Sequence, residues 1–450
     1  MNMTTVHRVY FIGIGGIGMS ALARYFKFLG KEVAGYDKTA SPLTKALEKD
    51  GLAIHYAEDM DLVPRSFLDS EGTLVVYTPA VPSSHKELHY FKAQGHVLKK
   101  RSEVLGMITN STFSLAVAGT HGKTTTSCIL AHLLKEAGAP LTAFLGGISE
   151  DFGSNFLLEG TDFSVVEADE FDRSFLHLTP NVACITSMDA DHLDIYGNKA
   201  ELERSFMEFS KRLKPNGKLL VRNGLPLEGL RYGIEDDSEY CIKNIRVEEG
   251  TYLFDLVAPN TELSGVRFSK PGRHNLLNAL AAFAMAMEAG FAPQGLAAAL
   301  ATFKGVVRRF TYRIKNSDFV FIDDYAHHPT EIEAVHQALQ EMHPEKKTVA
   351  IFQPHLYSRT RDFADAFADS LSKFDHVLLL EIYPAREEPI PGITSAWLME
   401  KMSSPSVKLV EKGALAGAIK ALDPEVLVAM GAGDIGLEIQ ELTKQWEHAH

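Results

Sequence analysis

The residues of this chain that could do chemistry begin with a loop suited to holding phosphate. Residues 119–124 read Gly-Thr-His-Gly-Lys-Thr, between the apolar run at 114–118 and a helical pattern. A lysine in such a turn reaches terminal phosphates, the backbone amides cradle them, and a threonine hydroxyl can bind Mg²⁺. The Walker pattern needs glycine where Val117 stands, so this turn is two residues tighter. We predict an ATP site formed by Gly119, Thr120, Gly122, Lys123, Thr124 and Thr125.

A second glycine loop lies near the N-terminus, between a strand pattern and a helix pattern. Gly13, Gly15 and Gly18 fit GxGxxG, and Asp37 follows the next strand about twenty residues later. Such a turn places a diphosphate on a helix N-terminus. It does not distinguish NAD from a sugar nucleotide.

Two acidic clusters follow the next strand patterns. The first comprises Glu167, Asp169, Glu170 and Asp172, and the second comprises Asp189, Asp191, His192 and Asp194. Carboxylates beside a phosphate loop are typical Mg²⁺ ligands. We expect Glu167 to be the direct ligand and His192 to contact a second metal or a phosphate.

Further polar residues follow the strand patterns of the last third of the chain. Arg359 and Arg361 could hold a carboxylate bidentately, and His327 or His328 could orient a small substrate or accept a proton. Open parallel sheets bind ligands beyond the carboxyl ends of their strands. We therefore interpret all these clusters as site residues.

Apolar β-branched runs alternate with helical patterns, which is typical of parallel sheets built from βαβ units. The predicted fold class is α/β with three domains. They are an N-terminal Rossmann-like parallel sheet at 1–107, a central P-loop-type ATPase domain at 108–312, and a C-terminal Rossmann-like domain at 313–450. Residues 238–270 alternate in period two, which indicates an antiparallel excursion.

Composition excludes several classes of protein. With 450 residues and a net charge of −13, the chain lacks the basic surface that nucleic acids require. Its three cysteines are far apart, which favours a reducing compartment such as the cytoplasm. The longest apolar stretch, 276–291, is too short to span a bilayer, so we expect no membrane segment.

The ordered set of motifs resembles the Mur ligase family over essentially the whole chain. The matching segments include GIGGIGMS, AGTHGKTTT, EADEFDRSFLHL, DHLDIY, GRHNLLNALAA, DDYAHHPTE, FQPH, YPARE and GAGDI. The closest resemblance is to members that add L-alanine to UDP-N-acetylmuramate. It implies an ATP-dependent ligase with Mg²⁺, or Mn²⁺ in its place, that forms an acyl phosphate and acts as a monomer or homodimer in peptidoglycan precursor synthesis.

The resemblance also implies roles for individual residues. Lys123, Glu167, His192 and His327 are the expected catalytic residues, with metal ligands at Thr124, Glu167 and His192. ATP contacts are expected from the phosphate loop and from Asn275, Arg308, Arg309 and Asp323. Contacts to the UDP-sugar are expected from Gly15, Gly16, Ile17, Gly18, Asp37, Thr78, Arg101 and His121. The amino acid is expected beside Tyr325, His327, His355 and Arg359.

Four alternatives remain open at this point. Leu356 follows His355 where many family members carry arginine, so glycine or serine could replace L-alanine as the amine. The ligase that recycles murein tripeptide shares the same plan. Outside the class, an NAD(P)-dependent oxidoreductase or a non-catalytic nucleotide-binding module would account for the first loop or for nucleotide binding alone.

Overall fold

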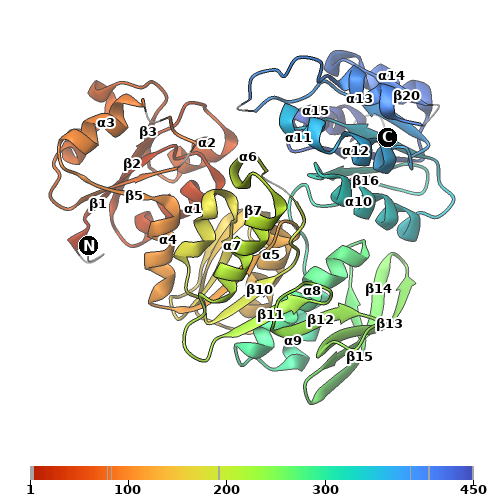
Figure 1. The fold of residues 1–450 in the computed structure, drawn as a ribbon, viewed down its shortest axis with the longest axis horizontal. Coiled ribbons are helices and arrows are strands. Elements are labelled where there is room, and N and C mark those ends of the chain that lie inside the picture. The colour runs from red at the N-terminus through yellow and green to blue at the C-terminus, as the bar shows by residue number, and fades with distance from the viewer. Residues whose placement is uncertain are drawn as a thin grey trace. The chain divides into compact units, whose positions relative to one another are not determined.

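The computed structural model describes residues 5–78, 80–82, 84–190, 193–385, 387–403 and 406–447 (Figure 1). The chain forms two compact units. The first holds Met1–Ile242, Leu256–Leu263 and Asn278–Lys304, and the second holds Lys243–Asp255, Ser264–Leu277 and Gly305–His450. Three parallel-rich sheets confirm the predicted three-domain α/β class. The predicted limits at 107 and 312 fall inside α4 (Arg101–Asn110) and β16 (Thr311–Lys315).

The N-terminal sheet is wholly parallel, in the order β3-β2-β1-β4-β5. A proline at the first turn and a Ser41–Thr44 capping box begin α2, which is why the helix starts there. The strands are β1 (Arg8–Ile12), β2 (Glu32–Tyr36), β3 (Ala53–His55), β4 (Thr73–Tyr77) and β5 (Val97–Lys100). The helices besides α4 are α1 (Ile17–Phe28), α2 (Pro42–Lys49) and α3 (Lys86–Ala93), with 3₁₀ turns η2 (Met60–Leu62) and η3 (Arg65–Leu68).

The central sheet runs in the order β15-β14-β13-β12-β11-β10-β6-β9-β7-β8. Its strands are β6 (Phe113–Ala118), β7 (Leu141–Ser149), β8 (Ser154–Leu158), β9 (Phe163–Ala168), β10 (Val182–Ile185), β11 (Lys218–Arg222), β12 (Leu230–Ile234), β13 (Tyr240–Glu248), β14 (Thr251–Ala258) and β15 (Thr261–Phe268). Its helices are α5 (Lys123–Glu136), η4 (Phe171–His177), α6 (Leu193–Tyr196), α7 (Lys199–Ser210), α8 (Arg273–Glu288) and α9 (Pro293–Leu300).

Register in this sheet brings the predicted clusters to one edge. β6 pairs in parallel with β9 and with β10, and Ala118 lies opposite both Ala168 and Ile185. The phosphate loop and both acidic clusters therefore leave the sheet side by side. Within the first unit, α1 packs on β7 and β8 through Tyr25, whose ring contacts Phe144 and Phe156.

The C-terminal sheet has the order β16-β17-β21-β18-β19-β20, and only the β16–β17 pair among those described is antiparallel. Alternate residues of its strands enter two apolar layers, so Ile322 packs on one face and Phe321 on the other. Its strands after β16 are β17 (Val320–Asp324), β18 (Thr348–Phe352), β19 (His376–Leu379), β20 (Val407–Leu409) and β21 (Val426–Met430). Its helices are α10 (Pro329–Met342), α11 (Tyr357–Asp362), α12 (Ala364–Leu371), α13 (Ser395–Lys401), η5 (Lys412–Ala414), α14 (Leu415–Leu422) and α15 (Ile435–Glu447).

Membrane-spanning helices were expected to be absent. Among the residues that the structure describes, no helix is both long enough and apolar enough to cross a bilayer.

Candidate active site

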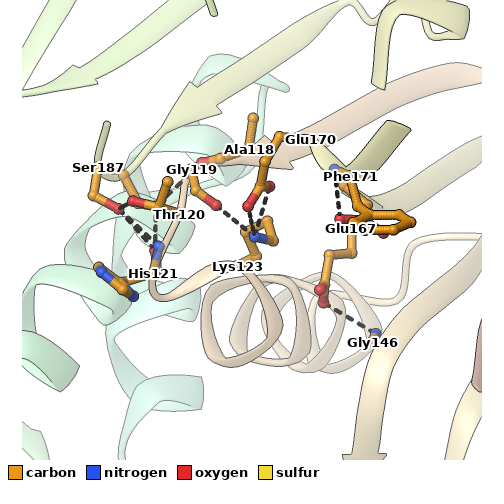
Figure 2. A network of polar contacts seen from close by, with 12 residues as sticks. Ala118, Gly119, Thr120, His121, Lys123, Gly146, Glu167, Glu170, Phe171 and Ser187 are labelled. Atoms are coloured by element: carbon orange, nitrogen blue, oxygen red, sulfur yellow. Dashed lines mark hydrogen bonds and ion pairs between the residues drawn. The ribbon is translucent and has the colours of Figure 1, made fainter. Parts of the chain in front are cut away.

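The loop between β6 and α5 is held in place by the strand beside it. Gly122 caps α5 with a φ of +82°, and a Cβ there would lie 2.5 Å from the Asn278 side chain, so glycine is required. The Ser187 hydroxyl lies 2.9 Å from the Thr120 hydroxyl and accepts a 2.8 Å bond from the backbone N–H of His121 (Figure 2). The turn is thus fixed before any ligand arrives.

Lys123 is engaged by the protein itself. Its ammonium donates to the carbonyl of Gly119 at 2.6 Å and to both carboxylate oxygens of Glu170, at 2.9 and 2.7 Å (Figure 2). Glu170 is fully buried, and 12% of the Lys123 side chain is exposed. Burial alone lowers the pKa of Lys123, but the carboxylates of Glu170, Asp169 and Glu167 raise it above its ordinary value. Lys123 is therefore a cation.

The Glu167 side chain lies near Lys123, and its carboxylate points to Gly146 (Figure 2). Its carboxylate accepts a 3.1 Å hydrogen bond from the backbone N–H of Gly146 on β7. Thr124, the first residue after Lys123, is buried at the start of α5. A carboxylate and a hydroxyl are oxygen donors, which suit Mg²⁺ when substrate phosphates complete its coordination.

The third predicted metal ligand, His192, lies outside the described residues, as does Asp191. Among the residues that are described, no group of three His, Cys, Asp or Glu side chains could hold a metal by itself.

The remaining acids of the first cluster pair with α4 and the residue before it. Asp169 lies 3.6 Å from the guanidinium of Arg101, and Asp172 lies 2.7 Å from the ammonium of Lys100. Asp172 and Arg173 both have left-handed backbone, with φ of +53° and +52°. The acids of this segment thus pair with different cations, and the turn ends in two residues of strained backbone.

The first glycine loop is shaped by the two side chains that its glycines admit. The backbone N–H of Gly15 donates to Asp37 at 2.7 Å, and a Cβ on Gly18 would lie 2.6 Å from the guanidinium of Arg101. These two distances explain why the GxGxxG pattern has glycine at Gly15 and Gly18. The side chains of Asp37 and Arg101 approach the backbone closely there.

A cavity of about 300 Å³ lies beside this loop. It is lined by the predicted sugar-nucleotide residues Gly16, Ile17, Gly18, Thr78 and Arg101 and by Gly146, Glu167 and Asp169, among others. Asp37 is held by Gly15, and His121 lies 3.5 Å from Asp189. The cavity therefore reaches from the first loop to Glu167.

In the second unit, Asp323, the next-to-last residue of β17, is a buried carboxylate between two guanidiniums. Arg308 donates to one of its oxygens at 3.2 Å, and Arg313 donates to the other at 3.2 and 2.6 Å. Arg308 also donates to the carbonyl of Gly431 at 2.5 Å. The neighbouring Asp324 accepts backbone bonds from Phe310 and Ala326, and burial raises its pKa to about 6.

The predicted amino-acid residues also gather in the second unit. The His327 ring lies 5.4 Å from Tyr325 and 6.1 Å from His355, and Arg359 approaches His355 at 3.3 Å. The guanidiniums of both Arg308 and Arg309 lie 5.1 Å from the Tyr325 ring centre. This is a compact cluster of aromatic rings and cations, suited to a small anionic or zwitterionic ligand.

Asn275, the predicted adenine contact, belongs to the second unit as well. It is buried, and its amide donates to the carbonyl of Pro271 at 2.7 Å.

Four residues of the candidate site have contacts that we did not predict from the sequence. They are Glu170 as partner of Lys123, Arg313 as partner of Asp323, Gly146 as donor to Glu167, and Tyr383, which stacks on His355 at 5.8 Å. Glu170 and Tyr383 stand in motifs that the sequence analysis quoted, so their position was visible although their contacts were not.

Comparison with known proteins gives consistent matches along the chain. Residues 8–112 match the "Mur ligase family, catalytic domain" model, 117–286 the "Mur ligase middle domain" model, and 308–433 the "Mur ligase, glutamate ligase domain" model.

Individual relatives cover nearly the whole chain. The UDP-N-acetylmuramate–L-alanine ligase of Christiangramia forsetii is 57% identical over 99% of both chains. The crystal structure of the UDP-N-acetylmuramate-alanine ligase of Thermotoga maritima matches with a TM-score of 0.84 at 27% identity, over 98% of this chain and 100% of that one. A murein peptide ligase of Psychrobacter arcticus shares the fold, with a TM-score of 0.70 at 23% identity over 97% and 98%.

Proposed function

Since the chain belongs to the Mur ligase family, we propose that it joins L-alanine to the carboxylate of UDP-N-acetylmuramate at the expense of ATP. The products are the amide, ADP and phosphate, and the reaction supplies a peptidoglycan precursor. Relatives that share more than half of its residues carry this activity in their names.

One observation from the structure carries the proposal. Glu167 lines the cavity beside the first glycine loop, and its carboxylate also acts on the ammonium of Lys123 (Figure 2). Activation of a carboxylate by ATP requires the sugar nucleotide and the γ-phosphate to meet. A side chain that borders both the cavity and the phosphate lysine marks the place where they would meet.

The chemistry then follows from charge. The muramyl carboxylate attacks the γ-phosphate and forms an acyl phosphate, and the amine of L-alanine displaces phosphate from it. Both partners of the first step are anions, so they approach only where cations neutralise them. Lys123 supplies one positive charge, and Mg²⁺, or Mn²⁺, held by Thr124 and Glu167 would supply Lewis-acid neutralisation of the phosphates.

The remaining predicted residues take binding roles in this proposal. Gly15 to Gly18, Asp37, Thr78, Arg101 and His121 serve the UDP-sugar, and Asn275, Arg308, Arg309 and Asp323 serve ATP. Tyr325, His327, His355 and Arg359 surround the amino acid, and His192 contributes to the metal. The guanidiniums of Arg308 and Arg309 over Tyr325 support an anion site in the second unit.

The domain limits at 107 and 312 remain part of the proposal, as do the cytoplasm as location and a monomer or homodimer as the active form. Three free, buried cysteines support a reducing compartment.

A direct test is incubation of the protein with UDP-N-acetylmuramate, ATP, Mg²⁺ and one candidate amine, followed by product mass and phosphate release. We expect the mass of the L-alanine amide, with less product from glycine or serine, since one methyl or hydroxyl in a pocket changes rates about 10- to 200-fold. Turnover with murein tripeptide and none with L-alanine would reject the proposal. So would tight NADH binding without ATP hydrolysis.

A further inference from the structure

We propose that Glu170 is a positioning residue that occupies the place of a nucleotide phosphate on Lys123 and is displaced when the nucleotide binds. The inference rests on the proposed function, because it takes the β6–α5 loop to be the ATP site. It adds that a carboxylate of the protein itself, that of Glu170, competes with the nucleotide phosphate for Lys123.

The first step is the hydrogen-bonding capacity of the lysine. An ammonium group has three N–H donors. Lys123 donates hydrogen bonds to the Gly119 carbonyl and to the two carboxylate oxygens of Glu170, all within 2.9 Å (Figure 2). A phosphate oxygen that reaches Lys123 must therefore replace one of these three oxygens, two of which belong to Glu170.

The second step is charge. Glu167, Asp169 and Glu170 each act on Lys123, and Asp169 also pairs with Arg101, so three acids here meet two cations. A triphosphate added to that set meets repulsion, even with a divalent cation on Glu167. If the Glu170 carboxylate turns away, the phosphate takes its place and the number of anions on Lys123 stays the same.

The third step is that Glu170 can release the lysine while its backbone stays anchored. The Tyr196 hydroxyl donates to the Glu170 carbonyl at 2.6 Å, and the backbone N–H of Arg173 donates to the same carbonyl at 2.9 Å. Side-chain rotation is then enough to free Lys123.

The neighbouring acid shows the same arrangement at the first site. Asp169 lies 3.6 Å from Arg101, and both line the cavity beside the first glycine loop. One short segment thus supplies a carboxylate to a cation of the predicted ATP site and to a cation of the predicted UDP-sugar site.

The test is calorimetric titration of ADP with Mg²⁺ into the full-length protein and its variants. If the Lys123–Glu170 pair is formed in about nine-tenths of the molecules, the apparent affinity for ADP is weakened about tenfold. Glu170→Gln should therefore bind ADP about tenfold more tightly than the parent, and its KM for ATP should fall as well. A merely structural role predicts the opposite sign, because a loosened lysine binds phosphate less well.

Asp172→Asn is the matched control. It removes the same charge two residues away, but its partner is Lys100 at the half-exposed surface. We expect its ADP affinity to stay within about twofold of the parent, so a general gain from lost negative charge would show here.

Unchanged or weaker ADP binding by Glu170→Gln would overturn the inference. If that variant shows no cooperative melting, Glu170→Asp replaces it, because the shorter carboxylate reaches Lys123 less well and should also tighten binding. If the unmodified protein does not bind ADP at all, the ATP site is rejected instead, and with it the proposed function.

Discussion

The two units neutralise their buried charges in opposite ways. In the first unit one ammonium, Lys123, pairs with the carboxylate of Glu170, and the carboxylates of Asp169 and Glu167 also act on it. In the second unit one carboxylate, Asp323, lies between the guanidiniums of Arg308 and Arg313. We call the group around Lys123 the first corner and the group around Asp323 the second corner. The first corner has an excess of carboxylates and the second an excess of guanidiniums.

This difference indicates which ligands each corner suits. Excess carboxylate with a hydroxyl nearby suits a divalent cation that brings phosphates with it. Excess guanidinium above an aromatic ring suits an anion. A ligase that must bring a nucleotide, a carboxylate and an amino acid together needs both kinds of corner.

The largest expected effect comes from removing the ammonium. Lys123→Ala should lower the ligation rate at least about 10³-fold, because the developing negative charge loses its nearest protein cation. Phosphate release measures the rate. Part of the effect could be structural, since Glu170 is left buried without this cation.

The double variant Lys123→Ala with Glu170→Gln separates the two causes. It removes both charges, so we expect its melting temperature to return toward that of the parent while ligation stays lost. Recovery of ligation in the double variant, or a near-normal rate in the single one, would contradict the role of Lys123.

Next in size is the buried carboxylate of the second unit. Asp323→Ala leaves two guanidiniums facing each other and should destabilise this unit by about 3–5 kcal/mol. Both tryptophans of the chain, Trp397 and Trp446, belong to the second unit, so tryptophan fluorescence in urea reports its unfolding. Asp365→Ala serves as control, because Asp365 pairs with Lys401 at the surface and should cost about 0–1 kcal/mol. Equal effects would remove the contrast between the corners.

A smaller effect is expected at the proposed metal ligand. Glu167→Gln should raise the Mg²⁺ concentration for half-maximal ligation about 10- to 100-fold, since the amide lacks the charge that Mg²⁺ prefers. Magnesium titration of the rate measures it, with Asp172→Asn as the variant of equal charge change. An unchanged magnesium requirement would place the cation elsewhere.

The smallest effect is expected at Glu87, a buried acid that contacts a tyrosine and a histidine. Glu87 accepts a hydrogen bond from Tyr10 and lies 3.5 Å from His55, and burial raises its pKa from 4.5 to about 7. The folded state therefore binds a proton that the unfolded state has released between about pH 4.5 and 7. This contribution to stability is complete below about pH 4.5 and is lost as the pH rises to about 7.

Glu87→Gln keeps the neutral form at every pH. Its stability relative to the parent should rise by about 1–3 kcal/mol between pH 4.5 and pH 8, as urea unfolding followed by circular dichroism would measure. A difference that does not change with pH would show that Glu87 titrates normally.

Much of this arrangement was predictable from sequence, because strand ends and turns are local features. The Gly-Thr-His-Gly-Lys-Thr turn, the acids after the next strands and the parallel order of the sheet all follow from short-range patterns. Which acid meets which cation did not follow. Glu170 pairs with Lys123 and Asp172 with Lys100, and the two left-handed residues Asp172 and Arg173 in this turn are not evident from the sequence Asp-Arg.

The C-terminal region shows a second reason for such limits. Asp323 was predicted as a nucleotide contact, but its partner Arg313 lies on an antiparallel strand whose register shifts between Tyr312 and Ile314. Cross-strand partners depend on such irregularities, which alternation of residue types does not encode. His192 stays a prediction, since it lies outside the described residues.

Pairing between β6 and β9 has a consequence for how this enzyme could change in length. Ala118 opposite Ala168 sets the offset between the phosphate loop and Glu167. Two residues inserted within β9 would slide Glu167 by about 6–7 Å along the sheet, whereas the same insertion at a remote surface loop would leave that offset untouched. Tolerance to insertion along this chain should therefore be lowest inside these two short strands, well below that of the loops around them.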